Sequence, residues 1–365
     1  MSRIDPASSN PFDAIIVGGG PAGSATAGLL ARAGLRALLI EATHYEKPSR
    51  LETLPPAVKP RLARLGAWSR FERQRHDRID GTIAFWGNAT RAVDEYAFSC
   101  YENAWLVNRR DFDRMLAEHA ADAGARVQLD TRVVGCHIAG SEWRVQVRTP
   151  AGVKTLRSWF VVDATGRTGT AGHAGSTRFV HDSIVAVTWL APANRGSAYA
   201  LLETAADGWF YSAEREDGCV AAMYVTDARR LRSSGTGITR SVSTALESAP
   251  HTSMRIRHSA REWMPRVVSA AISMRSPTAG PQWVSVGDAA ASMDPLCGRG
   301  VVDALDSAFA ASAAIGSSRS AAALAAYQKS VSTRWLRDLT IRREYYASER
   351  RWCRSGFWRR RVCPS

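Results

Sequence analysis

Three glycines near the start of the sequence have a spacing that suits a bound pyrophosphate. Gly18, Gly20 and Gly23 follow an apolar run, Ala14 to Val17, in the pattern G-x-G-x-x-G, and a run of small residues suited to a helix comes next. Gly18 permits a tight turn, Gly20 lets a pyrophosphate approach the backbone, and Gly23 lets the helix pack closely on the strand. The start of the helix presents free N–H groups and the positive end of its dipole to the phosphates.

An acidic residue closes this unit. A second apolar run, Ala37 to Ile40, ends at Glu41, where the carboxylate can accept hydrogen bonds from ribose hydroxyls. An acid at this place favours a free ribose 2′-hydroxyl, so the pattern predicts FAD or NAD rather than NADP. A glycine-rich turn without a ligand is the alternative, and the complete order of strand, glycines, helix, strand and acid argues against it.

Two later motifs favour FAD over NAD. The first, Val161 to Arg167, is an apolar strand that breaks at small and polar residues, Ala164 and Gly166 among them. The second, Trp283 to Ala290, contains a Gly-Asp pair ending in Asp288, and a Pro/Gly loop and a helix rich in alanine follow it. This order would present a carboxylate to a ribityl chain and N–H groups to a flavin ring.

These motifs resemble those of the FAD-dependent monooxygenase superfamily, which includes aromatic hydroxylases, geranylgeranyl reductases and flavin-dependent halogenases. The resemblance implies that Asp288 contacts the ribitol and that the loop with Pro295, Gly298 and Gly300 borders the isoalloxazine. It also implies that Arg109, near the start of a helix, sits by the flavin. The expected cofactor-binding set is completed by residues within or between these motifs: Pro21, Ala22, Ser24, Val134, Ala164, Gly166 and Val301.

A narrower resemblance covers nearly the whole chain. The segments that carry it are Glu52 to Pro56, Leu65-Gly66, Leu202-Glu203, Gly208 to Ser212, Thr226-Asp227 and the end of the chain from Tyr345 to Arg361. They are similar to halogenase-like flavoproteins, and the last of them to one subgroup. The members of that subgroup hydroxylate a tryptophan side chain within a partner polypeptide, during maturation of tryptophan-derived quinone cofactors.

Two departures and one absence bear on the activity. Leu51 stands where the family usually has Gly, and Arg299 where it has Gln or Glu, so a non-catalytic flavoprotein scaffold is one alternative. Family halogenases carry W-x-W-x-I-P and a lysine in the stretch that corresponds to 79–87; this stretch has neither, and Lys59 lies too early. A halogenase therefore ranks below a monooxygenase, and a geranylgeranyl-reductase-like oxidoreductase is a third alternative.

The resemblance thus predicts a monooxygenase acting on an electron-rich, tryptophan-like aromatic, either a small molecule or a side chain of a partner polypeptide. Reduced FAD would form a C4a-hydroperoxide with O2 and transfer OH⁺ to the ring. Glu52 is the carboxylate predicted for the catalytic site, with a purely structural role as the alternative. No second G-x-G-x-x-G is present, so we expect transient NAD(P)H or a separate flavin reductase to supply electrons.

The predicted fold is α/β, with a Rossmann-like FAD-binding lobe of the glutathione-reductase type, an inserted antiparallel β-sheet substrate lobe and a C-terminal helical segment. The FAD-binding lobe is expected to be discontinuous. The predicted boundaries are 11–60, 105–170 and 276–330 for this lobe, 61–104 and 171–275 for the substrate lobe, and 331–365 for the basic C-terminal segment.

Composition limits the other classes. The sequence has no apolar run near the length of a spanning helix and no signal-peptide pattern, so we expect a cytoplasmic protein without a transmembrane segment. Six cysteines without C-x-x-C and eight histidines without ligand spacing predict no metal site.

The net charge of +14 is concentrated at the end of the chain, where ten arginines face three acids between Thr333 and Val362. The pattern predicts either a helix with a solvated arginine face and a frayed tail, or a docking surface for an acidic partner protein. In both cases Arg359, Arg360 and Arg361 would contribute little to stability. No nucleic-acid recognition motif accompanies the charge, so nucleic acid is not an expected partner.

Overall fold

A parallel sheet forms the centre of one lobe. The computed structural model describes residues 10–46, 51–88, 90–169, 175–194, 196–233, 237–256, 263–316 and 320–362. The sheet has the order β20-β21-β12-β1-β2-β8, and β20 is its one antiparallel strand. Its strands are β1 (Ala14–Val17), β2 (Ala37–Ile40), β8 (Arg126–Gln128), β12 (Val161–Asp163), β20 (Ala279–Gly280) and β21 (Trp283–Ser285).

Both faces of this sheet are covered, which explains why its two central strands β1 and β2 consist of apolar residues only. Helices α1 (Pro21–Arg32), α4 (Arg109–Asp122) and α8 (Gly300–Gly316) cover one face, where Ile16 packs. A three-stranded sheet of β9 (Arg132–Ala139), β10 (Glu142–Thr149) and β11 (Gly152–Ser158) covers the other, where Ile15 packs against Trp143.

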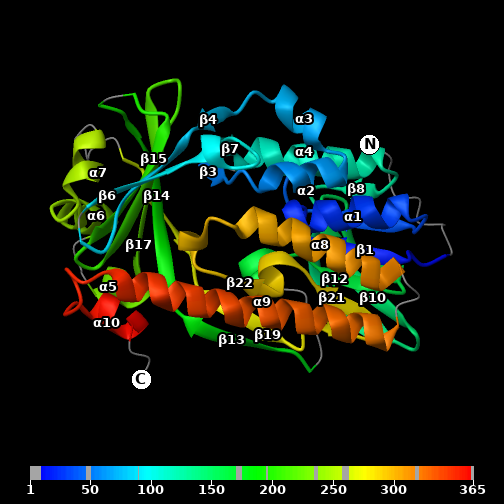
Figure 1. Cartoon of the computed structure of the whole chain (residues 1–365). Coiled ribbons are helices and arrows are strands. Elements are labelled where there is room, and N and C mark those ends of the chain that lie inside the picture. The colour runs from blue at the N-terminus through cyan, green and yellow to red at the C-terminus, as the bar shows by residue number, and fades with distance from the viewer. Residues whose placement is uncertain are drawn as a thin grey trace.

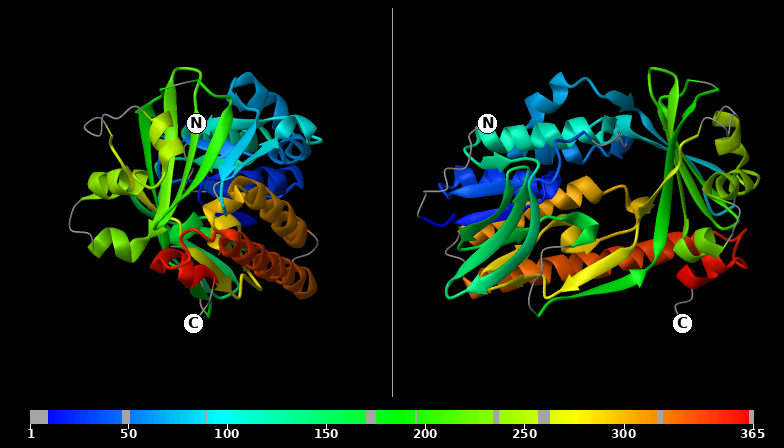
Figure 2. Two further views of the ribbon diagram at one scale, coloured as in Figure 1. Left: turned by 60° about the vertical axis from the view of Figure 1, so that its left-hand side comes forward. Right: turned by 180° about the vertical axis from the view of Figure 1, so that it is seen from behind.

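A seven-stranded sheet builds the second lobe, in the order β18-β14-β17-β16-β15-β5-β6. Its strands are β5 (Gly81–Phe85), β6 (Arg91–Glu95), β14 (Ile184–Pro192), β15 (Tyr199–Ala205), β16 (Gly208–Glu214), β17 (Cys219–Asp227) and β18 (Arg266–Ser269). All neighbours are antiparallel except β15 and β5. Helices α5 (Ala228–Ser233), α6 (Ile238–Leu246) and α7 (Pro250–Arg255) lie at its outer face (Figure 2).

Two small sheets lie between the lobes. One pairs β3 (Leu51–Leu54) and β4 (Asp77–Ile79) with β7 (Ala104–Asn108), next to helices α2 (Val58–Leu65) and α3 (Trp68–Arg73). The other pairs β13 (Thr177–Asp182) and β22 (Ala291–Ser292) with β19 (Ile272–Ser276). Short 3-10 turns complete the fold: η1 (Tyr96–Phe98), η2 (Gly166–Thr168), η3 (Gly287–Ala289) and η4 (Pro295–Cys297).

One long helix spans both lobes. Helix α9 (Ala321–Ser348) has 28 residues and is therefore about 42 Å long. Near its start the Tyr327 hydroxyl donates to the Ser285 carbonyl of β21 at 2.6 Å, and near its end Tyr346 accepts from Trp209 of β16 at 2.9 Å. Figure 1 shows α9, orange to red, running beneath both lobes to α10 (Gly356–Val362).

The α/β fold class predicted from the sequence is confirmed. The described residues of the small-residue run from Ala308 to Ala326 lie mostly in two helices, the end of α8 and the start of α9. No helix in the described ranges is long and apolar enough to cross a membrane.

The expectation of a frayed, solvated tail is wrong for residues 356–362, which form a packed helix, although Arg359 and Arg360 remain exposed. Phe357 and Trp358 in α10 are almost completely buried, and Arg361 is only 4% exposed. Arg360 and Arg361 both pair with Asp227, and Arg361 also pairs with Asp182. Arg361 is buried because strands distant in sequence supply carboxylates to it, whereas the side chain of Arg360 is 62% exposed.

Candidate functional site

The glycine loop leaves open the space that a phosphate needs. Gly18 has φ of +109°, and a Cβ there would lie 2.4 Å from the carbonyl oxygen of Ala164. A Cβ on Gly23 would lie 1.9 Å from the carbonyl oxygen of Gly18, so only glycine allows this packing. A Cβ on Gly20, the N-cap of α1, would meet no heavy atom within 4 Å. The two outer glycines thus shape the turn, and the middle one faces open space at a helix N-terminus.

Glu41 holds this loop from the end of β2. Its Oε2 accepts the Gly19 N–H at 2.9 Å, and its Oε1 accepts the N–H and the hydroxyl of Thr43 at 2.9 and 2.7 Å. Each carboxylate oxygen has two acceptor sites, so Oε2 can also accept a bond from a ribose hydroxyl. The Tyr45 hydroxyl and the Ser24 hydroxyl both donate to the Gly19 carbonyl, at 2.8 and 3.0 Å.

The carboxylate expected at the ribityl chain lies on η3. Asp288 Oδ2 accepts from Arg167 Nε at 2.9 Å, and Arg167 Nη2 donates to the Met293 carbonyl at 3.2 Å. Arg167 therefore joins Asp288 to the loop expected to border the flavin. Sequence reasoning quoted Arg167 within its motif without giving it a role, and it overlooked Thr43 and Tyr45, for which no sequence signal exists.

The loop between η4 and α8 is the expected border of the isoalloxazine. It turns at Gly298, which has φ of +59° and whose Cβ would meet nothing within 4 Å. A Cβ on Gly300, the first residue of α8, would have only Glu52 Oε1 near it, at 3.9 Å. Arg299, the departure from the family pattern, pairs with Asp303 on the first turn of α8 at 3.2 Å.

Glu52 and Arg109 form the charged centre of the site. Arg109 Nη1 donates to Glu52 Oε2 at 2.6 Å, and the same guanidinium pairs with Asp113 one turn further along α4 at 3.0 Å. Burial works against the charge of Arg109, but Asp113 and Glu52 outweigh it and hold the pKa of Arg109 above its ordinary value. Arg109 is thus a fixed cation that orients Glu52 beside the start of α8.

An aromatic side chain from the second lobe reaches the same strand as Glu52. The Tyr211 hydroxyl of β16 donates to Thr53 Oγ1 at 2.8 Å, and burial raises the pKa of Tyr211 well above its ordinary value. Tyr211, Tyr96 and Leu51 are partly buried and pack against one apolar cluster. Side chains alternate along β3, so Leu51 and Thr53 point to the face opposite to Glu52, and this cluster supports the strand from behind.

The other predicted residues fall in several places. Pro21, Ala22 and Ser24 form the first turn of α1 and are buried, and Ala164 and Gly166 flank the turn after β12. Val301 on α8 is 3% exposed and packs in an apolar cluster.

Val134 and Pro295 complete the set. Val134 lies on β9 and is 41% exposed. Pro295 begins η4. The structure thus gathers most of the set around the two helix starts, with Val134 on the neighbouring sheet.

Two further observations bear on the chemistry. No group of three or more His, Cys, Asp or Glu side chains within the described segments could hold a metal ion. Cys297 lies in the loop before α8, and burial raises its pKa to about 12, so its thiol stays protonated near neutral pH.

The residues present fit FAD. Gly20 and Gly298 have no atom within 4 Å of the place that a Cβ would take. Oε2 of Glu41 has a second acceptor site beside the one used by Gly19, and the Asp288 side chain on η3 is 36% exposed. We expect Gly18 to Gly23 to hold the pyrophosphate, Glu41 the ribose, Asp288 the ribityl chain, and Pro295 to Gly300 the flavin ring.

Comparison with known proteins supports this cofactor. Residues 12–334 match the model of the FAD binding domain family. LodB of Marinomonas mediterranea, named as an FAD-dependent oxidoreductase, is 25% identical over 366 residues, which cover 96% of each chain. The solved peptidyl tryptophan dihydroxylase QhpG, essential for tryptophylquinone cofactor biogenesis, has a TM-score of 0.81 at 25% identity, covering 96% of this chain and 79% of that one.

The flavin-dependent halogenase CmlS has a TM-score of 0.83 at 23% identity, covering 98% of this chain and 68% of the other, and shares the fold. The family match spans most of the chain and includes both helix starts that shape the site. The chain therefore belongs to the FAD binding domain family and is an FAD-dependent oxidoreductase.

Proposed function

We propose that this oxidoreductase is a monooxygenase that hydroxylates an electron-rich aromatic ring, a tryptophan side chain of a partner polypeptide above all. The observation that carries the proposal is the position of Glu52. Its Oε1 lies 3.9 Å from the place that a Cβ on Gly300 would take, and Arg109 fixes its other oxygen at 2.6 Å. The similarity to QhpG, whose name gives a peptidyl tryptophan as substrate, supports the substrate class.

Glu52 is placed to assist chemistry on an aromatic ring. Bound FAD, once reduced, supplies the activation of dioxygen. Tyr211, Tyr96 and Leu51 pack behind β3 and support the strand that carries Glu52, and the Tyr211 hydroxyl, held by Thr53, stays protonated. Glu52, oriented by Arg109, could accept the proton that an aromatic ring loses after oxygen is added.

A halogenase is the second candidate, because CmlS and other halogenases share the fold. A lysine is what family halogenases use to capture the oxidised halide. None of the four lysines of this sequence lies in the stretch 77–95, and Lys59 on α2 lies over the Trp68 ring at 5.5 Å. These positions favour hydroxylation over halogenation.

A competition experiment separates the two candidates. The protein with FAD, a flavin reductase, NADH and oxygen would receive a tryptophan-containing peptide in buffer with chloride and bromide. We expect a mass gain of one oxygen atom on the indole by mass spectrometry. A halogenated peptide would overturn the proposal. If the product is lost when a chemical reductant replaces the reductase and NADH, the reaction requires the enzymatic electron donor.

The role of Glu52 has its own test. Glu52→Gln should retain FAD, because Arg109 keeps Asp113, and should lower the hydroxylation rate about 100-fold if a general base is lost. Glu72→Gln, on an exposed carboxylate of α3, is the matched control and should leave the rate unchanged. Equal hydroxylation rates in the Glu52→Gln variant and the wild-type protein would show that Glu52 has only a structural role.

An acidic partner could still dock on the C-terminal segment, on fewer arginines than the sequence suggested. Arg343, Arg350, Arg354 and Arg359 are among its exposed arginines, whereas Arg342 and Arg361 are buried in ion pairs. If these four bind the partner, association should weaken between low and high salt, because charges are screened over about 10 Å at 0.1 M. Replacing all four with Ala should remove that salt dependence while the FAD content stays constant; unchanged salt dependence would locate the contact elsewhere.

A further inference from the structure

The loop that borders the proposed flavin site begins with a buried carboxylate whose two oxygens have different tasks. Asp294 Oδ1 accepts the Leu296 N–H at 3.0 Å, and the Asp294 side chain thereby caps the 3-10 turn η4. The backbone of Asp294 adds a second bond, from the Cys297 N–H to its carbonyl at 3.1 Å. The direction in which η4 leaves β22 therefore depends on how this side chain is held.

Helix α9 holds the other oxygen. Asp294 Oδ2 accepts from Arg342 Nε at 2.7 Å and from the Tyr346 hydroxyl at 2.9 Å. The side chains of Asp294 and Arg342 are 0% and 4% exposed, and Tyr346 is completely buried. Removal of either donor would leave a charge or a polar atom in the interior with fewer partners, so the three groups have one favourable arrangement.

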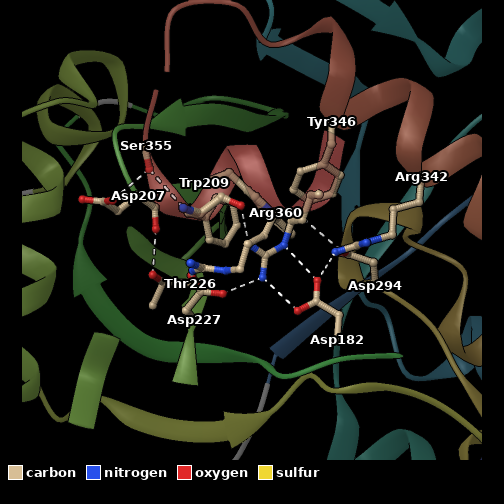
Figure 3. A network of polar contacts seen from close by, with 12 residues as sticks. Asp182, Asp207, Trp209, Thr226, Asp227, Asp294, Arg342, Tyr346, Ser355 and Arg360 are labelled. Atoms are coloured by element: carbon tan, nitrogen blue, oxygen red, sulfur yellow. Dashed lines mark hydrogen bonds and ion pairs between the residues drawn. The ribbon is translucent and has the colours of Figure 1, made fainter. Parts of the chain in front are cut away.

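A second layer of ion pairs fixes these donors in turn. Arg342 Nη2 pairs with Asp182 of β13 at 2.5 Å, and Asp182 also accepts from Arg361 Nη2 at 3.0 Å. Arg361 reaches Asp227 of β17 at 2.7 Å. Figure 3 shows this network, which joins α9 and α10 to β13, to β17 and to the loop that carries Asp294.

The network also reaches the strand that carries Tyr211. Trp209 Nε1 donates to the Tyr346 hydroxyl at 2.9 Å, so that hydroxyl links β16 to Asp294. Trp209 and Tyr211 are two residues apart and therefore face the same side of the sheet. One of them is tied to Asp294 through Tyr346 and the other to Thr53 beside Glu52.

We infer that Arg342 and Tyr346 are positioning residues for the flavin-bordering loop, and that the relay Trp209–Tyr346–Asp294 couples the conformation of this loop to strand β16 of the second lobe. The inference goes beyond the proposed reaction and does not depend on the identity of the aromatic substrate. Arg361 acts on the loop through Asp182 and Arg342.

Tyr346→Phe tests the relay with the smallest change, because it removes the hydroxyl and leaves the buried ring. In the apoprotein, hydrogen exchange should become about tenfold faster at the amides of Leu296, Cys297 and Gly298, whose bonds build η4. The dissociation constant for FAD should rise about fivefold, and the flavin absorption maximum should shift. Tyr345→Phe, on an exposed neighbour, is the matched control and should change none of these.

The outcomes separate positioning from simple attachment of the tail. If Tyr346→Phe lowers the melting temperature but leaves amide exchange at Leu296 and FAD binding as in the wild-type protein, the inference is overturned. Asp294→Asn is the second variant, for the case that Tyr346→Phe does not fold. It should accelerate exchange at Leu296 in the same way, and normal exchange there in a folded Asp294→Asn protein would equally refute the relay.

Discussion

The glycine loop at residues 18–23 and the arginine-rich segment at 342–361 obtain the negative charge that suits them from different sources. The loop leaves a space open at a helix start, and the negative charge that it suits would come from a bound cofactor. For the C-terminal segment the negative charge comes from other parts of the same chain: Asp182, Asp227 and Asp294 neutralise its buried arginines. The first region is built to receive a ligand, and the second to join parts of the chain.

The difference teaches how far charge can be read from a sequence. A run of arginines is solvated when no carboxylate can reach it, and becomes a structural element when separate strands supply carboxylates. Arg359 and Arg361 are two residues apart, yet the first is exposed and the second is 4% exposed. Their contrast provides the sharpest test of this comparison.

The largest effect is expected for Arg361→Ala. The change removes one partner of a buried pair and leaves Asp182 and Asp227 with less compensation, so the free energy of unfolding should fall by about 3–5 kcal/mol. Arg359→Ala should change it by less than about 0.5 kcal/mol. Urea unfolding of both variants measures the difference. Similar small losses of stability in the two variants would show that the ion pairs of Arg361 contribute no more than a surface charge does.

How much of the fold and of the candidate site the sequence predicts depends on whether the interacting residues lie close together in the sequence. The strand–glycine–helix unit was predictable because its features stand in one contiguous stretch that ends at Glu41. The contact between Glu52 and Arg109 was not, because 57 positions separate them and only the pairing of β3 with β7 brings them together. The family resemblance placed both near the flavin without indicating the ion pair.

The tail was misread for the same reason. The partners of its arginines lie on β13, on β17 and in the loop before η4, far away in sequence. Nothing in a charge count distinguishes Arg361 from Arg359. Neither Thr43 nor Tyr45 stands in a motif, so their contacts with Glu41 and Gly19 emerge only from the folded loop.

A pair of alanine substitutions breaks the glycine loop in two different ways. Gly23→Ala places a Cβ 1.9 Å from the Gly18 carbonyl, so the apoprotein itself should lose about 1–3 kcal/mol of stability. Gly20→Ala meets nothing within 4 Å and should leave the apoprotein as stable as the wild type. Its FAD affinity should nevertheless fall about tenfold or more, because the methyl group would occupy the place of the phosphate. Calorimetry of the apoproteins and FAD titration measure both quantities.

Equal FAD affinity in Gly20→Ala and wild-type protein would show that the pyrophosphate lies elsewhere. A Gly23→Ala apoprotein with wild-type stability would show that the turn can widen freely. Either result would weaken the comparison between a loop shaped to bind a charged cofactor and a segment whose charges are neutralised within the protein.

His76 shows a third way to bury a basic group, which is to lose the charge. Burial lowers its pKa to about 4, against the raising effects of Asp77 and Asp111, and its ring packs on Phe71 at 4.4 Å. Since the unfolded chain takes up a proton near pH 6.5 and the folded chain does not, stability should fall as the pH falls from 6.5 towards 4.

The variant His76→Phe keeps an aromatic ring at this position and removes the group that titrates. Relative to the wild type, the variant should gain about 1 kcal/mol between pH 7 and pH 5, after allowance for the partial exposure of His76. Urea midpoints at the two pH values give this difference directly, because carboxylates that titrate in the same range are common to both proteins. A constant difference between the two proteins would mean that His76 is protonated in the folded state and is balanced by Asp77 and Asp111, as the arginines of the C-terminal segment are by their carboxylates.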